Sequence, residues 1–253
     1  MTASVPASFS TPAQSANSLT ATVRPSGLVV PNVSVGKNLE TDVSIRLNGV
    51  PQSSVSVTIS SNDPSRLLFS QTATSPGLAQ ITLSIPARTI GTDFFAQGLD
   101  SSGTATYTVS AAGYGSATGT VTLAPSGIFI AGQSGGFISK TGPNNVGFIS
   151  FETATGLGSP SIIIAAAMLD SAGKIADTNQ LVAGGLSVNV NLTSSNTAAG
   201  TISPSTVTIP GGSSSADTSF QPVGPGNSTL TLNTPAGFST PAQFTAATVG
   251  VAY

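Results

Sequence analysis

The chain of 253 residues contains no cysteine, no histidine and no tryptophan. Without cysteine it can form neither a disulfide nor a thiolate metal site, and without histidine it lacks the usual base of a nucleophilic triad and a common zinc ligand. Any acid–base chemistry would have to come from nine carboxylates. We therefore expect a protein that is not an enzyme.

Charge is also scarce, at 6% of residues, against about 25% in an average soluble domain. The seven basic residues are scattered singly, whereas nucleic-acid binding requires clustered lysine and arginine. The longest apolar run, 162–169, is far shorter than the roughly 20 residues that cross a bilayer. These features predict no nucleic-acid partner and no transmembrane segment. The uncharged, hydroxyl-rich composition favours an extracellular or cell-surface location.

What the chain has in abundance is alternation of apolar and polar residues with a period of two, which is typical of half-buried β-strands. Helical periodicity is hard to find, and the best helical candidate is 163–174. The isoleucines before it and the Asp170–Gly173 turn after it favour a buried strand and a hairpin loop. The fold class predicted is all-β. The alternating runs are 54–60, 79–85, 104–110, 186–192, 206–209 and 228–233.

Internal repeats divide the chain. The hexapeptide Phe-Ser-Thr-Pro-Ala-Gln occurs at Phe9–Gln14 and again at Phe238–Gln243, each time before a strand-like end. A looser copy lies at 112–123. Because no domain precedes the first copy, residues 1–24 are expected to form an N-terminal strand that resembles the end of a preceding repeat.

The two halves that follow also match. Pro-Ser-Gly opens the first at Pro25 and the second at Pro125, an offset of 125 − 25 = 100 residues. Near the close, Ala112 matches Ala236, an offset of 236 − 112 = 124 residues. We therefore expect one domain at 25–124 and a second at 125–253. The second should carry an inserted hairpin or loop, mainly within 131–160.

The second half carries a recognisable series of motifs at 187–196, 202–213, 216–220 and 226–232. In this series the chain resembles the bacterial immunoglobulin-like repeats of invasin-type and intimin-type secreted or surface proteins. The resemblance implies two tandem immunoglobulin-like β-sandwich domains. Such modules serve as spacers, adhesin stalks, filament subunits and accessory domains of carbohydrate-active enzymes, so the family predicts the fold better than the function.

The carboxylates give little indication of a catalytic or metal-binding site. Glu40 and Asp42 lie two apart on one face of a predicted strand, where we expect a solvated face or ion pairs with a nearby base. Asp93 and Asp100 are interpreted as turn caps around a core-facing phenylalanine. Calcium requires several clustered carboxylates, and the chain has no Asp-x-Asp run. No cofactor is expected, with calcium as the open alternative.

Aromatic side chains offer the candidate ligand surface. Phe137, Phe148 and Phe151 lie in or beside the predicted insertion and would suit polysaccharide or a host receptor; the alternative is that they fill the core. Tyr107 lies in an alternating strand, so its register decides between core and surface. Tyr114 occupies the position of Phe238 in the repeated turn, which predicts packing at a domain end.

The N-terminal segment offers a candidate self-association strand through Phe9, Leu19 and Val23. An unpaired strand is a template for pairing with a sheet of a neighbouring copy. The alternative is that the segment is only the end of a preceding repeat of a longer array. The sequence thus predicts a non-catalytic structural protein, a stalk or filament subunit that associates with itself or with neighbouring repeats. An adhesin module that binds through the insertion is the alternative function.

Overall fold

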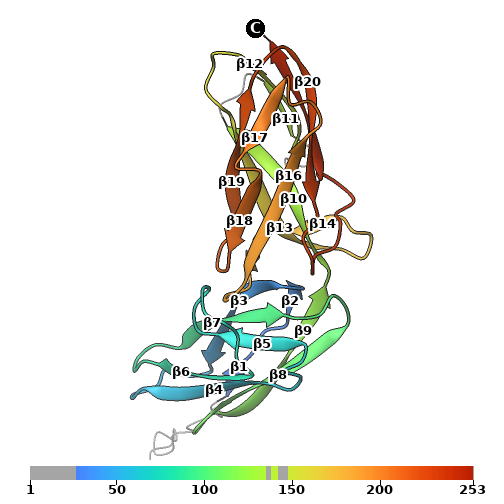
Figure 1. Ribbon diagram of the computed structural model, residues 1–253. Helices are drawn as coiled ribbons and strands as arrows, with labels where there is room; N and C mark the ends of the chain where they lie inside the picture. The colour runs from blue at the N-terminus through green and yellow to red at the C-terminus, as the bar shows by residue number, and fades with distance from the viewer. Residues whose placement is uncertain (1–26, 135–137, 142–147, 253) are drawn as a thin grey trace, which may run out of the picture.

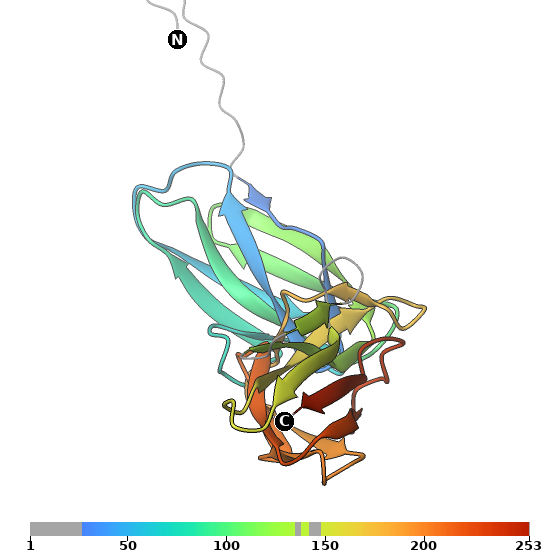
Figure 2. The ribbon, with the colours of Figure 1, turned by 90° about the horizontal axis from the view of Figure 1, so that it is seen from above.

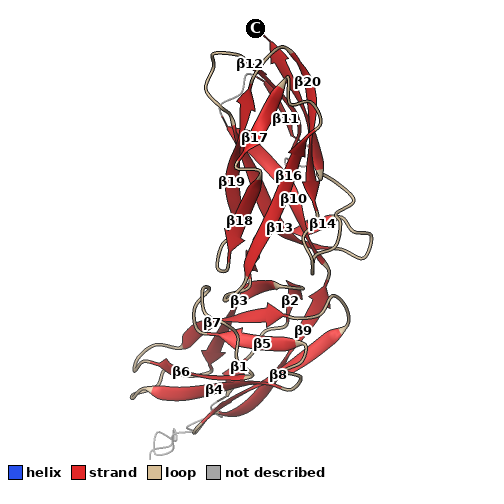
Figure 3. Ribbon diagram, in the orientation of Figure 1, coloured by secondary structure: helices blue, strands red, loops and turns tan. Residues whose placement is uncertain are grey.

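The structure is a computed structural model that describes residues 27–134, 138–141 and 148–252, with side chains described outside 133–149. Strands and connecting loops make up the described part, which contains no helix (Figure 3). The strands form two β-sandwiches placed end to end, and the first is tilted relative to the long axis of the second (Figure 1). The described chain ends at the far end of the second sandwich.

The first sandwich contains strands β1 to β9 in two facing sheets. One sheet has the order β1 (Leu28–Val29), β3 (Leu39–Leu47), β7 (Gly91–Gly98), β5 (Leu67–Ser70). The other has the order β2 (Val33–Gly36), β9 (Gly115–Ala124), β8 (Thr104–Ala111), β4 (Val55–Ser61), β6 (Gln80–Ile85). The four-strand and three-strand cores of these sheets have the arrangement of an immunoglobulin sandwich.

The second sandwich repeats this order with additions. Its first sheet has the order β10 (Ser126–Ser134), β13 (Ser161–Leu169), β19 (Ser215–Pro222), β17 (Gly200–Ser203), and β14 (Ile175–Asp177) also pairs with β13. Its second sheet has the order β11 (Ile138–Thr141), β12 (Phe148–Ala154), β21 (Ala246–Ala252), β20 (Gly226–Asn233), β16 (Ser187–Ser194), β18 (Thr206–Pro210).

The predicted alternating runs are confirmed as strands β4, β6, β8, β16, β18 and β20. Their apolar residues point into the sandwiches, as Val57 and Ile59 do on β4. Tyr107 of β8 also points inward and is fully buried, with its ring 5.5 Å from that of Phe69 and 6.1 Å from that of Phe94. Tyr114 packs against the core as expected, half-buried.

Strand β13 is buried on both faces, which explains its unbroken run of apolar residues. Ile162 and Ile164 face the main core, while Ala165 and Ala167 form a small second cluster with Phe129. The prediction of a strand here, in preference to a helix, is confirmed. A central strand that is covered on both sides has no need of a polar face.

The predicted hairpin is present as β11 and β12, which pair antiparallel. Strand β12 also pairs in parallel with the last strand β21, as β2 pairs in parallel with β9 in the first sandwich. Strand β12 is therefore the counterpart of β2, and β11 is the added strand. A second addition, 170–186, was not predicted; it contains β14 and β15 (Leu181–Val182).

The two sandwiches meet where β9 passes into β10 through Pro125. Figure 2 views this arrangement along the second sandwich, with the first behind it and offset to one side. The division of the sequence at 24/25 and 124/125 stays a prediction.

Candidate functional site

Most of the predicted site residues fall where the structure gives no side chain. Phe9, Leu19, Val23 and Phe137 lie outside the described residues. Phe148 begins β12, but its side chain is not described. The self-association strand and these two candidate ligand contacts therefore stay predictions.

Phe151 is described, and its assignment to a ligand surface is wrong. Its side chain is 2% exposed and its ring stands edge-on to that of Phe220, with 5.9 Å between the ring centroids. Strand alternation places Phe151 toward the core, between exposed or half-exposed neighbours. The alternative that it fills the core is confirmed.

Of the two aspartates predicted to cap turns, one does so and the other does not. Asp93 lies within β7 with an exposed side chain, so it caps no turn. Asp100 behaves as predicted: it accepts a hydrogen bond from the backbone N–H of Ser101 at 2.7 Å and forms an ion pair with Arg66 at 3.0 Å. The hydrogen bond from Ser101 and the pairing with Arg66 lower the pKa of Asp100.

Glu40 is the largest correction. It was expected on a solvated strand face, yet none of its surface is exposed. It lies on the outer face of β3, opposite the core, where β15 of the second sandwich adds to the edge of β3. In that antiparallel pairing Leu181 lies opposite Glu40 and Val182 lies opposite Leu39. A segment about 140 residues away in the sequence therefore covers this carboxyl group.

This contact belongs to a joint that we define as residues 34–40, 70–76 and 97 of the first sandwich with 180–186 and 211–213 of the second. The backbone continues the ladder, since the N–H of Ala183 donates to the carbonyl oxygen of Asn38 at 3.0 Å. Two further bonds join residues 34–40 to other parts of the second sandwich. The Ser126 hydroxyl donates to the carbonyl oxygen of Lys37, and the side-chain amide of Asn38 donates to the carbonyl oxygen of Gly237 at 3.0 Å.

Gln180 connects the second sandwich to the edge of β2. Its amide oxygen accepts from the N–H of Gly36 at 2.9 Å, and its amide nitrogen donates to the carbonyl oxygen of Ser34 at 3.1 Å. The side chain is 2% exposed. An edge strand leaves the backbone groups on its outer side without a partner in its own sheet. The side chain of Gln180 therefore pairs with one backbone N–H and one carbonyl oxygen of β2 that have no partner within the first sandwich.

Within the described part of the chain, the hydrogen bonds to the Glu40 carboxyl group all go to one of its two oxygens. Oε2 accepts from the backbone N–H of Gly184 at 2.9 Å and from the Gln97 amide at 2.9 Å. Oε1 is buried without a hydrogen-bond partner among the described residues. Burial raises the pKa of Glu40 from its ordinary 4.5 to about 7, against the lowering effect of the bonds from Gly184 and Gln97.

Beside the Glu40 carboxyl group, the backbone of the second sandwich at Gly184 comes very close to the backbone of the first sandwich. A Cβ atom added at Gly184 would collide with the carbonyl oxygen of Ser75 and come within 2.8 Å of that of Ala73. Both belong to the loop between β5 and β6 of the first sandwich. Only glycine leaves room for such an approach of two backbones.

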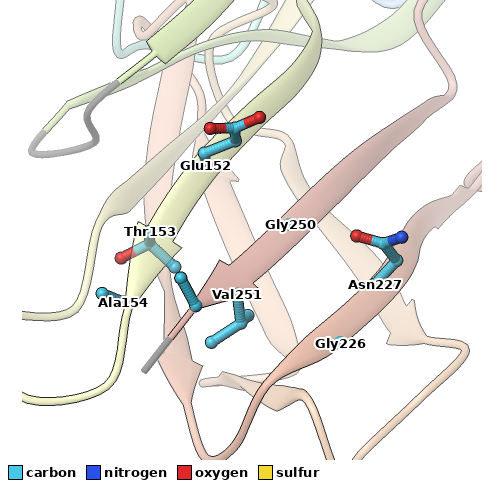
Figure 4. Close-up of a pocket in the computed structure, with 8 residues that line it drawn as sticks. Glu152, Thr153, Ala154, Gly226, Asn227, Gly250 and Val251 are labelled. Carbon is cyan, nitrogen blue, oxygen red and sulfur yellow. The ribbon is translucent and has the colours of Figure 1, made fainter.

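A separate hollow of about 400 Å³ lies at the far end of the second sandwich. Glu152 of β12 and Asn227 of β20 project on either side of Gly250, which lies opposite both in the central strand β21 (Figure 4). Thr153 also lines the hollow, and its hydroxyl is buried without a partner among the described residues. The hollow has room for a small polar group.

The described ranges contain neither a cluster of metal-ligating side chains nor a helix that could cross a membrane. No group of three or more acidic, histidine or cysteine side chains there is placed to hold a metal ion. That part of the chain also holds no helix long and apolar enough to span a bilayer.

The protein is similar to known proteins in its structure and not detectably in its sequence. No known protein-family profile matches the sequence, and no curated protein is similar to it. The adhesin InvE of Yersinia pseudotuberculosis is 14% identical over 89% of this chain and 59% of its own, with a TM-score of 0.32. CBD12 from CALX1.2 is 13% identical over 87% of this chain and 96% of its own, with a TM-score of 0.30.

A non-cellulosomal cohesin from Archaeoglobus fulgidus is 11% identical and covers 40% of this chain and 91% of its own, with a TM-score of 0.30. Similarity at this level carries no argument about function. The strand order within each pair of sheets does identify the architecture. The chain has the fold of two tandem immunoglobulin-like β-sandwiches, as its sequence predicted.

Proposed function

We propose that this protein is a non-catalytic structural protein of the cell surface or extracellular space, a spacer whose two sandwiches are held at a fixed relative orientation. The observation that carries the proposal is the joint. There, Gln180 and Gly184 of the second sandwich bond to Gly36, Ser34 and Glu40 of the first.

Sandwiches joined by a short connection move relative to each other by default, unless the interface restrains them. Here the interface buries polar groups that find partners only in one arrangement, and breaking that arrangement would leave them unsatisfied. The connection itself is the single residue Pro125, whose ring fixes its φ angle. Both features favour one orientation over many.

The surface location is supported by composition. Few charges and many serine and threonine side chains give an uncharged, hydroxyl-covered exterior. Antibodies raised against the folded protein should label intact cells of the natural host. Labelling that requires permeabilised cells would contradict this part of the proposal.

The fixed orientation can be tested by pulsed dipolar EPR. Because the chain has no cysteine, Ser84→Cys on β6 and Ser205→Cys beside β18 would place one nitroxide on each sandwich, both at exposed positions. We expect a single narrow distance distribution at pH 5.5. Gly184→Ala should broaden or shift it, because the added methyl group collides with the Ser75 carbonyl oxygen.

The matched control is Gly158→Ala, an exposed loop glycine of the second sandwich with nothing near an added Cβ atom. It should leave the distribution unchanged. A distribution in the unmodified protein that is broad at pH 5.5 as well as at pH 8.5 would contradict the spacer. A Gly184→Ala protein as narrow and unshifted as the control would show that the joint does not set the orientation.

The narrower form of the proposal is a filament subunit that polymerises by strand addition through 1–23. Its support is the sequence match between Phe9–Gln14 and Phe238–Gln243, the latter directly preceding the last strand. Size-exclusion chromatography and negative-stain microscopy should show filaments that deletion of 1–23 abolishes. A monomeric full chain would reject the filament and leave the spacer standing.

A further inference from the structure

The joint contains a group that can change its charge. Glu40 has no exposed surface, and its Oε1 atom lacks a hydrogen-bond partner among the described residues. Its Oε2 atom holds the N–H of Gly184 from the other sandwich. A buried carboxylate needs compensation for the water it has lost, so whether this carboxyl group is neutral or ionised affects the contact between the sandwiches.

The groups packed around Glu40 are uncharged. Strand β7 contributes Gln97, whose amide nitrogen also contacts the Ser70 hydroxyl of β5 at 3.2 Å and the Ser75 carbonyl oxygen at 3.1 Å. The segment after β15 contributes the backbone N–H of Gly184. None of these groups carries a positive charge that would stabilise an ionised carboxylate.

The titratable groups nearby are mostly acidic. On its own strand, Asp42 lies two residues further along, and its pKa is raised by burial and, to a lesser extent, by the negative charge of Asp93 on β7. Asp177, before β15, accepts from Gln180 at 3.2 Å. Lys37 precedes β3, and the ion pair found among the described residues joins Arg66 to Asp100, not a base to Glu40.

We propose that Glu40 is a proton-controlled latch of the joint: the neutral carboxyl group holds segment 180–186 against β3, and loss of its proton releases the segment and lets the two sandwiches move independently. This inference rests on the proposed spacer function and adds a regulation to it. The proton is the ligand, and no other molecule is required.

The direction follows from linkage. In the closed joint the pKa of Glu40 is raised to about 7, whereas an opened joint would expose the carboxyl group to water and return it to about 4.5. The closed state therefore binds the proton more tightly. Its advantage is complete below pH 4.5 and is lost as the pH rises through 7. Between about pH 5.5 and 8.5 the ratio of open to closed joints should rise about 30-fold.

The first test uses the spin-labelled full chain described above, at pH 5.5 and 8.5. We expect a narrow distance distribution at the lower pH and a broader one at the higher pH. Glu40→Gln, which is neutral at both pH values, should stay narrow. Glu152→Gln removes the other glutamate of the chain, an exposed one in β12, which Figure 1 shows at the end of the second sandwich away from the first. This variant should keep the pH response.

The second test reads the carboxyl group directly. The chain has only two glutamates, Glu40 and Glu152, so carbon-13 labelling of glutamate gives two carboxyl signals in NMR. One should titrate near pH 7 and disappear in Glu40→Gln. If both signals titrated near pH 4.5, the latch proposal would be overturned. This measurement uses the unmodified protein, so it does not depend on whether Glu40→Gln folds.

The outcomes separate the two proposals. A distribution that is narrow at both pH values keeps the spacer and rejects the latch. A distribution that is broad at both rejects the spacer and the latch together. A Glu40→Gln protein that broadens as much as the unmodified protein assigns the response to another group and rejects the latch.

Discussion

The hydroxyl group of Tyr107 donates a hydrogen bond of 2.7 Å to the carbonyl oxygen of Pro31. This contact joins β8, in the middle of one sheet, to the segment between β1 and β2, where the chain crosses from one sheet to the other. The ring of Tyr107 fills the core and its oxygen holds this crossing in place.

Replacing that hydroxyl group should weaken the first sandwich. Tyr107→Phe keeps the ring but leaves the Pro31 carbonyl oxygen without this donor, which should lower the free energy of unfolding by about 1 kcal/mol. Urea unfolding followed by circular dichroism measures it. The control is Tyr114→Phe, at a half-buried position, and an equal loss in both variants would refute the role given to the Tyr107 hydroxyl group.

Alkaline pH should act on the same residue. Burial raises the pKa of Tyr107 from 10.0 to about 12, so the folded protein keeps the phenol neutral where the unfolded chain ionises it. Stability from this group is present below pH 10 and is lost as the pH rises from 10 towards 12. Ultraviolet titration of the unmodified protein minus that of Tyr107→Phe should show a phenol that ionises near 12. A midpoint near 10 would contradict the burial of this side chain.

The ring of Tyr107 also depends on a glycine beside it. A Cβ atom added at Gly119 of β9 would lie 2.7 Å from the Tyr107 hydroxyl oxygen and closer still to its ring. Gly119→Ala should therefore destabilise the protein by about 1–3 kcal/mol through overpacking. Gly49→Ala, where nothing lies near the added atom, is the control for the loss of glycine itself. Equal unfolding free energies for the two variants would argue against this packing.

Phe151 tests the core of the second sandwich. Phe151→Ala removes a ring that packs on Phe220 and should lower the free energy of unfolding by about 3–5 kcal/mol. Leu157→Ala, at an exposed position, should change it by less than about 0.5 kcal/mol. Thermal or urea unfolding measures both. A Phe151→Ala protein of unchanged stability would return this residue to the candidates for a ligand surface.

The strands and the fold class could be predicted because their signal is local. The alternation of Val55, Val57 and Ile59 places one face of β4 inward whatever surrounds it. The continuous apolar run in β13 indicates a buried strand. The residues that cover its outer face, such as Phe129 and Phe244, could not be identified from the sequence.

The joint could not be predicted, because the residues that bury Glu40 lie far from it in the sequence. By its local pattern Glu40 belongs to the polar face of β3, as Asp42 and Ser44 do. The addition at 170–186 covers this end of the strand, whereas comparison of the two repeats places the extra residues mainly within 131–160. A carboxyl group with no nearby base is a weak signal of burial in a chain with so few charges.

The parallel pairing of β2 with β9 determines how the first sandwich would respond to a pulling force. Strand β2, near its start, and β9, its last strand, lie side by side and run in the same direction, from Val33 opposite Val121 to Gly36 opposite Ala124. Tension on the two ends of the sandwich would slide these strands past each other, so their hydrogen bonds would be loaded in shear and at the same time. The same geometry recurs between β12 and β21, so both sandwiches would give way abruptly under load and not by peeling one bond after another.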